Sequence, residues 1–117
     1  MKWELRNENM RDIAEKDWKH FTKLHQLAVN RFSKETLSKI NQIIISKEIE
    51  SKYEKYLEIC RYIKERDKVL RDCFNDIRRS TAKLHILELY NLGLIKPEEF
   101  NQFSDDVKKF VNDCNKL

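Results

Sequence analysis

Apolar side chains recur every three or four positions along most of this sequence, which is the spacing of one face of an α-helix. The first stripe lies between residues 18 and 44, where neither Gly nor Pro interrupts it. Its members are Trp18, Phe21, Leu24, Ala28, Phe32, Leu37, Ile40 and Ile44. The pattern therefore predicts a long amphipathic helix over about residues 10–45.

A second stripe with the same spacing predicts another long helix over about residues 47–91. Its apolar members include Tyr53, Leu57, Ile63 and Leu70. Apolar positions become sparse at residues 65–68 and again at residues 78–80. Because a helix without an apolar face has little to bury, a bend is expected near residues 78–81.

The end of this second helix is the best-defined boundary in the sequence. Gly93 follows the stripe, where a residue with a left-handed backbone would end the helix, and Leu94 can make the apolar contact that accompanies such an end. Pro97 presets the first turn of another helix. We therefore expect short helices over about residues 97–102 and 104–115, the second of which starts at a serine, a favoured N-cap.

The composition favours the same architecture, because the 117 residues include one Gly and one Pro, and turn-rich folds need more of both. We expect an all-α protein with one domain, residues 1–117, built as a long antiparallel helical hairpin with short C-terminal helices. Two such helices cannot cover their own apolar stripes. We therefore favour a homodimer in which two hairpins form a four-helix bundle. Folding back of the second helix at its bend and docking on another protein are the alternatives.

Charge and cysteine content limit the environment of the protein. The net charge is +4, and acidic and basic residues are interspersed. The longest strictly apolar run, Ile43–Ile45, is far shorter than the roughly 20 residues that span a bilayer. We expect a cytoplasmic protein with no membrane association and no cofactor. We also expect Cys60, Cys73 and Cys114 to stay reduced, because an odd number without close pairing does not form a disulfide framework.

The densest basic surface predicted on the second helix consists of Arg71, Arg78, Arg79 and Lys83. Arginine can bind phosphate or carboxylate groups through two parallel hydrogen bonds. This surface is a possible docking site for an anion or an acidic partner. In the simpler interpretation it is a solvated helix face whose charges pair with nearby acidic residues.

Histidines and one cysteine supply the remaining candidate chemistry: His20, His25, His85 and Cys60. Di-metal sites in helical bundles use Glu-x-x-His on two helices with further carboxylates. Here one pair has the reverse order, His85 before Glu88, and the other has Asp17 before His20. No glycine is placed to build an oxyanion hole. We predict no catalytic residues and no metal ligands.

Nine apolar positions on the two long helices form the candidate interface: Trp18, Phe21, Phe32, Ile40, Ile44, Tyr53, Leu57, Ile63 and Leu70. Long amphipathic stripes without a catalytic constellation favour a small protein–protein interaction module, such as an adaptor, regulator or inhibitor. One alternative is a nucleic-acid accessory protein that uses the basic surface. The other is an enzyme or a metal protein built on the histidines.

Overall fold

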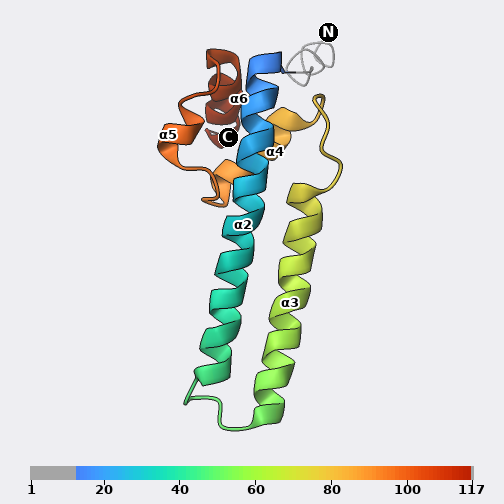
Figure 1. The fold of residues 1–117 in the computed structure, drawn as a ribbon, viewed down its shortest axis with the longest axis vertical. Coiled ribbons are helices and arrows are strands. Elements are labelled where there is room, and N and C mark those ends of the chain that lie inside the picture. The colour runs from blue at the N-terminus through green and yellow to red at the C-terminus, as the bar shows by residue number, and fades with distance from the viewer. Residues whose placement is uncertain (1–12, 117) are drawn as a thin grey trace. The chain divides into compact units, whose positions relative to one another are not determined.

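The computed structural model describes residues 13–116, and these contain five α-helices (Figure 1). The helices are α2 (Glu15–Ile45), α3 (Lys52–Phe74), α4 (Ala82–Asn91), α5 (Pro97–Phe100) and α6 (Asp105–Asn115). No strand occurs in this part of the chain, so the predicted all-α class is confirmed. None of its helices is both long enough and apolar enough to cross a lipid bilayer.

The chain divides into two compact units. The described part of the first unit comprises residues 13–28 and 76–116, and the second unit is Val29–Asn75. Helix α2 contributes its first half to one unit and its second half to the other. The prediction that residues 1–117 form one domain stays a prediction.

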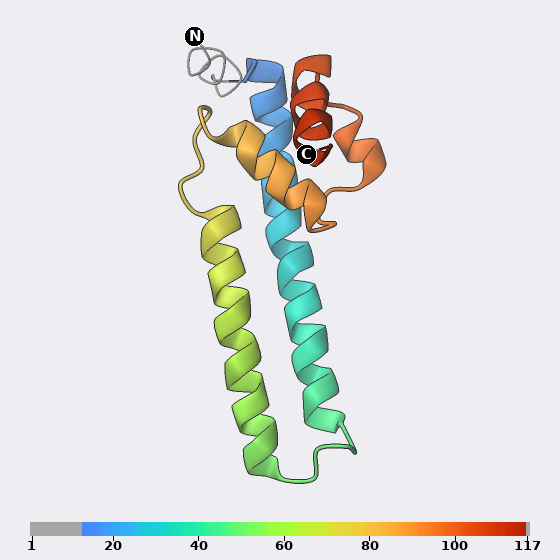
Figure 2. The same ribbon diagram turned by 180° about the vertical axis from the view of Figure 1, so that it is seen from behind.

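The first unit has a dense apolar core. The first half of α2 packs there with α4, α5 and α6 (Figure 2). The largest of its fully buried side chains are Phe21, Ile86, Leu89, Leu94, Val107 and Val111. The amphipathic spacing of α2 and α6 explains this arrangement, because each helix directs one apolar face inward and leaves charged residues outside.

Gly93 ends α4 as the sequence predicts. Its φ is 74°, in the left-handed region, where glycine carries no steric penalty. The Leu94 N–H donates to the Leu89 carbonyl over 3.0 Å, and the Gly93 N–H donates to the Tyr90 carbonyl over 3.1 Å. These two bonds are those of a Schellman motif. The motif buries Leu94 and leads the chain to Pro97, the first residue of α5.

The second unit is an antiparallel hairpin of residues 29–45 of α2 and the whole of α3 (Figures 1 and 2). Ser51 caps α3 by accepting a hydrogen bond from the Glu54 N–H. The Lys55 ammonium group donates to the Ile44 carbonyl over 2.8 Å and closes the hairpin end. Only three apolar side chains of this unit are buried, and each is still 5–6% exposed: Phe32, Ile43 and Cys73.

The range predicted as one helix, residues 47–91, contains two helices, because α3 ends at Phe74 and α4 begins at Ala82. The bend expected near residues 78–81 lies within the segment that separates them. Asn75 ends α3. It precedes Asp76, whose φ of 59° is left-handed, a conformation that Asp tolerates better than most residues. Thr81 organises the break, because its hydroxyl accepts from the Arg78 N–H at 3.1 Å and lies 3.0 Å from the Asp76 carbonyl.

The other helix boundaries lie close to the predicted ones. Helix α2 begins at Glu15 and ends at Ile45, against a predicted range of 10–45, and residues 10–12 lie outside the described part of the chain. Helix α5 ends at Phe100 and continues as a turn, where 97–102 was expected. Helix α6 has Ser104 as its N-cap residue.

We predict that Gly93→Ala lowers the free energy of unfolding by about 1 kcal/mol, because an L-residue at this φ is strained. No atom lies within 4 Å of the position a Cβ would take, so the effect comes from the backbone alone. Urea unfolding monitored by helical circular dichroism measures it. Gly93→Asn should recover part of the loss, and equal stability of Gly93→Ala and the natural protein would contradict the assignment.

Candidate functional site

Two histidines predicted as candidate ligands approach one another in the first unit. His85 on α4 lies close enough to His25 on α2 to affect its titration. The pKa of the His25 imidazole is lowered, first by desolvation on burial and then by the positive charge of His85. His85 Nδ1 lies 3.7 Å from the Glu88 carboxylate, and its Nε2 lies 3.3 Å from the Asp76 carbonyl oxygen. No group of three metal-ligating side chains occurs within residues 13–116.

Asp17 and His20 connect α2 to the C-terminal elements of the first unit. The buried Asp17 carboxylate accepts from the Ser104 N–H at 2.9 Å and from the Ser104 hydroxyl at 2.6 Å. His20 Nε2 lies 2.7 Å from the Glu99 carbonyl oxygen, and its ring meets the edge of Phe103 with centroids 4.7 Å apart. Asp17 and His20 therefore connect α2 to the segments around α5 and α6. The Ser104 hydroxyl donates to Asp17 and makes no capping hydrogen bond to its own helix.

The four basic candidates have different surroundings. Lys83 is buried, and its ammonium group pairs with Asp106 at 2.7 Å. Arg79 donates to the Ile13 carbonyl over 3.1 Å. Arg78 is exposed and pairs with Asp76 at 2.9 Å. Arg71 is exposed in the last turn of α3, in the second unit.

The two helices of the hairpin meet along an inner seam, a row with alternating steps of three and four residues. On α2 it contains Val29, Phe32, Thr36, Lys39 and Ile43, and on α3 it contains Lys55, Ile59, Tyr62, Arg66, Val69 and Cys73. Several of these residues are polar, so the inner seam has less apolar surface to bury than a typical two-helix contact. Specific polar contacts therefore carry part of the pairing.

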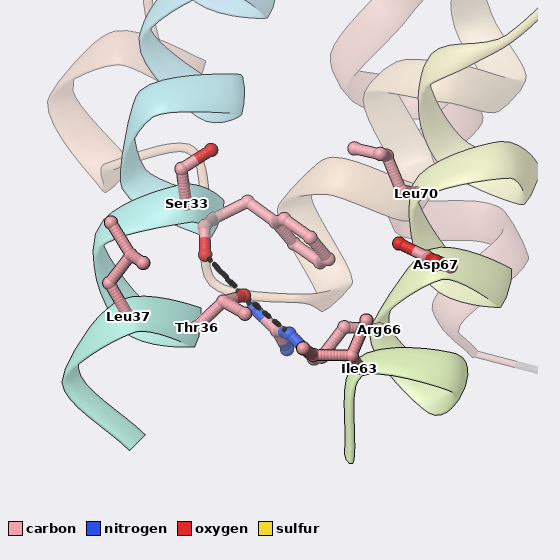
Figure 3. Close-up of a pocket in the computed structure, with 8 residues that line it drawn as sticks. Ser33, Thr36, Leu37, Ile63, Arg66, Asp67 and Leu70 are labelled. Atoms are coloured by element: carbon pink, nitrogen blue, oxygen red, sulfur yellow. Dashed lines mark hydrogen bonds between the residues drawn. The ribbon is translucent and has the colours of Figure 1, made fainter. Parts of the chain in front are cut away.

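Arg66 makes most of these polar contacts. Its Nε–H donates to the Thr36 hydroxyl over 2.8 Å, and another guanidinium N–H donates to the Phe32 carbonyl over 3.2 Å (Figure 3). Its guanidinium carbon lies 3.7 Å from the centre of the Phe32 ring, which is a close cation–π contact. Glu35 adds an ion pair at 3.5 Å. One side chain thus joins α3 to a full turn of α2.

A second row runs beside the inner seam on the same two helices, shifted by one position in sequence. We call it the outer seam. On α2 it comprises Ser33, Leu37, Ile40 and Ile44, and on α3 it comprises Tyr53, Tyr56, Cys60, Ile63, Asp67 and Leu70. Many of its side chains are exposed: Leu37 to 66%, Ile44 to 52%, Tyr53 to 68%, Tyr56 to 63% and Ile63 to 38%.

The outer seam borders a pocket of about 340 Å³ between α2 and α3. Figure 3 shows Leu37 and Ser33 on the α2 side, and Ile63, Asp67 and Leu70 on the α3 side. Arg66 and Thr36 also line it, and Figure 3 marks the hydrogen bond between them. The lining is mainly apolar, and the pocket is open to solvent. This groove is the candidate functional site of the chain.

The nine residues predicted as an interface stripe separate into two groups. Phe21 is buried and Trp18 half-buried in the first unit, where their rings lie 5.9 Å apart. Phe32, Ile63 and Leu70 line one pocket of the second unit. The remaining four belong to the hairpin, where Ile40 is half-buried and three are exposed: Ile44, Tyr53 and Leu57.

Sequence reasoning missed Arg66 and the presence of two adjacent seams. In the apolar pattern of the sequence, residues 65–68 are a sparse part of a single stripe because they carry charge. The sequence nevertheless contains a signal for this contact. Thr36 and Arg66 both occupy positions where the spacing of the inner seam calls for an apolar residue. A polar residue at a core position is informative when another polar residue on the partner helix can satisfy it.

His25 should make stability depend on pH. The pKa of His25 in the folded state lies below the usual 6.5, so the unfolded chain binds the proton more readily. Neutral His25 therefore contributes to the free energy of unfolding in full above about pH 6.5. This contribution is lost as the pH falls through the folded-state pKa. We expect the urea midpoint to fall between pH 7.5 and pH 5.5. His25→Gln should make this fall shallower. A fall as steep in His25→Gln as in the natural chain would contradict the assignment.

Arg66→Ala should lower the free energy of unfolding of the hairpin by about 2 kcal/mol, because it removes two hydrogen bonds and a ring contact. Arg66→Lys should lose about half of this, since an ammonium group lacks the planar fork. Arg61→Ala is the matched control: its arginine is exposed and pairs only with Glu58 at 2.8 Å. Urea unfolding should separate Arg66→Ala from Arg61→Ala, and coincident curves would exclude this role for Arg66.

Comparisons with protein-family models, with curated proteins and with solved structures find no match to this chain. No relative therefore supplies an activity, a ligand or a set of site residues. The groove and the exposed outer seam of the hairpin are the features that point to a function.

Proposed function

We propose that this chain is a helical protein–protein interaction module and that the outer seam of the α2–α3 hairpin is its docking surface. The observation that carries the proposal is the exposure of large apolar side chains in register on two adjacent helices. Tyr53 and Leu37 are each about two-thirds exposed, at 68% and 66%. Scattered exposed apolar residues are ordinary, but a contiguous row is typical of an interaction site.

The spacing of the outer seam suits an α-helix as the docked element. Rows with alternating three- and four-residue steps present knobs and holes that another helix can fill. The groove between Leu37 and Ile63 provides a hollow for an apolar anchor. In helix-in-groove recognition, an amphipathic helix places its apolar face into such a hollow. A third helix against α2 and α3 would bury residues that the hairpin leaves in water.

The alternatives use the same chain differently. A homodimer would cover the outer seam with a second hairpin and complete a four-helix bundle. Nucleic-acid binding has less support, because Lys83 and Arg79 already contact Asp106 and the Ile13 carbonyl within the first unit. An enzyme or metal protein based on His20, His25, His85 and Cys60 has no cluster of ligands to start from within residues 13–116.

The test compares retention of a partner from lysate of the source cell by the natural chain and by Leu37→Glu. A buried contact at Leu37 should make the variant lose at least about tenfold of the retained protein, as at an interface hot spot. Leu27→Glu is the matched control, because Leu27 is an exposed leucine of the same helix in the first unit. Equal retention by all three proteins, with matching circular dichroism, would overturn the proposal.

A further inference from the structure

The residues that flank the outer seam carry one sign of charge. Each helix has a border row beside the outer seam, on the side away from the inner seam. On α2 this row contains Lys34 and Asn41, and on α3 it contains Leu57, Lys64 and Arg71. All five are exposed. Three of the five are cationic and none is acidic, so the apolar face has a basic border.

The acidic residues of the hairpin lie at a different position around the helices. One row, spaced by seven residues and placed beyond the inner seam, holds Glu35 and Gln42 on α2 and Glu58, Glu65 and Asp72 on α3. By helical periodicity this row lies on the side of each helix opposite the outer seam, about 100° further round than the border row. The hairpin is therefore basic beside its apolar face and acidic behind it.

This distribution discriminates between occupants of the groove. Residues that flank an apolar seam set the choice of partner, because they meet the flanking residues of the docked helix. A second copy of the hairpin would bring Lys34, Lys64 and Arg71 against their own equivalents. It would supply one carboxylate, Asp67, in its outer seam, and its acidic row would lie on the far side. A helix with acidic flanks would meet each cation with a carboxylate.

We infer that the outer seam binds an amphipathic helix of another protein whose apolar stripe is flanked by Glu or Asp. This inference rests on the proposed function and specifies the chemistry of the partner. The groove favours a helix over an anionic membrane surface, because its pocket of about 340 Å³ is a hollow between α2 and α3. Binding to a lipid surface instead relies on an amphipathic helix that lies in the interface plane with its apolar face buried among the lipids.

Asp67 supplies a second constraint on the partner. It is the single carboxylate in the outer seam, and it lines the pocket with Ile63 and Leu70 (Figure 3). A polar residue in an otherwise apolar seam fixes the register of the docked helix, because an apolar residue opposite it would leave a charge without a partner. We expect the bound helix to place one Lys or Arg opposite Asp67, although the residues that flank its apolar stripe are acidic.

A displayed library tests this inference without knowledge of the natural partner. The library consists of amphipathic helices of about 21 residues, three heptads, with Glu, Gln or Lys at every flanking position. Their seam positions are apolar, except that any one of them can instead be Lys or Arg. Selection is made on the full-length chain, and binders retained by Leu37→Glu are discarded. The inference predicts enrichment of Glu at the flanking positions. Enrichment of Lys or Gln, or the absence of any binder that depends on Leu37, would overturn it.

A charge exchange on α3 supplies the control. Lys64→Glu with Arg71→Glu reverses the border row, whereas Lys23→Glu with Lys109→Glu makes the same change of net charge at exposed positions of the first unit. The selected acidic peptides should bind the first double variant at least about tenfold more weakly and the second nearly as well as the natural chain. Equal weakening by both would mean that net charge, and not the border row, governs binding.

Other occupants give distinct results in solution. A mass of two chains by light scattering that returns to one chain in Leu37→Glu would identify a second copy. Co-sedimentation with phosphatidylserine vesicles that is lost in Leu37→Glu would identify a membrane surface. Each result overturns the inference. Retention of a lysate partner through Leu37, together with no preference for acidic flanks, would leave the interaction module standing and reject only the partner's charge.

Discussion

Arg66 determines how the two long helices of the hairpin pair, because it replaces an apolar contact at the centre of their inner seam. Its guanidinium group needs acceptors wherever it is shielded from water, and Thr36 and the Phe32 carbonyl supply them. The Phe32 ring then stacks against it. This constraint fixes which faces of α2 and α3 meet, and so directs Leu37 and Ile63 away from the contact. The exposed outer seam is a consequence of that register.

The first unit shows the opposite balance of apolar and polar contacts. Phe21, Leu89 and Val107 are fully buried, and the polar contacts lie around this core. Asp17 shows how the ends of the unit are fixed, because its carboxylate bonds Ser104 at the start of α6. Here burial of apolar surface stabilises the fold and polar groups set its geometry. In the hairpin, few side chains are fully buried, so a docked helix could bury more apolar surface and stabilise the hairpin further.

Helical periodicity predicted the all-α class, the long first helix and the end of α4 at Gly93. The segment between α3 and α4, residues 75–81, was located only in part: a bend was expected near residues 78–81, but not the end of a helix at Phe74. Its start is hard to place because apolar residues on both sides keep helical spacing. Asn75 followed by Asp76 was the missed signal, since both side chains compete with helical hydrogen bonds. The basic candidates also depended on tertiary structure: the sequence does not show that Asp106 lies beside Lys83. Long-range pairing of this kind cannot be obtained from the spacing within one helix.

Site-specific photo-crosslinking in the source cell tests the central claim most directly. A photoreactive phenylalanine analogue replaces Leu37 in the outer seam, and another chain carries it at Leu27 as the comparison. The account predicts that position 37 crosslinks to a helical segment of another protein with Glu or Asp beside its apolar stripe, and that position 27 does not. Crosslinks from position 37 only to a second copy of this chain, only to lipid, or to nothing would contradict the account.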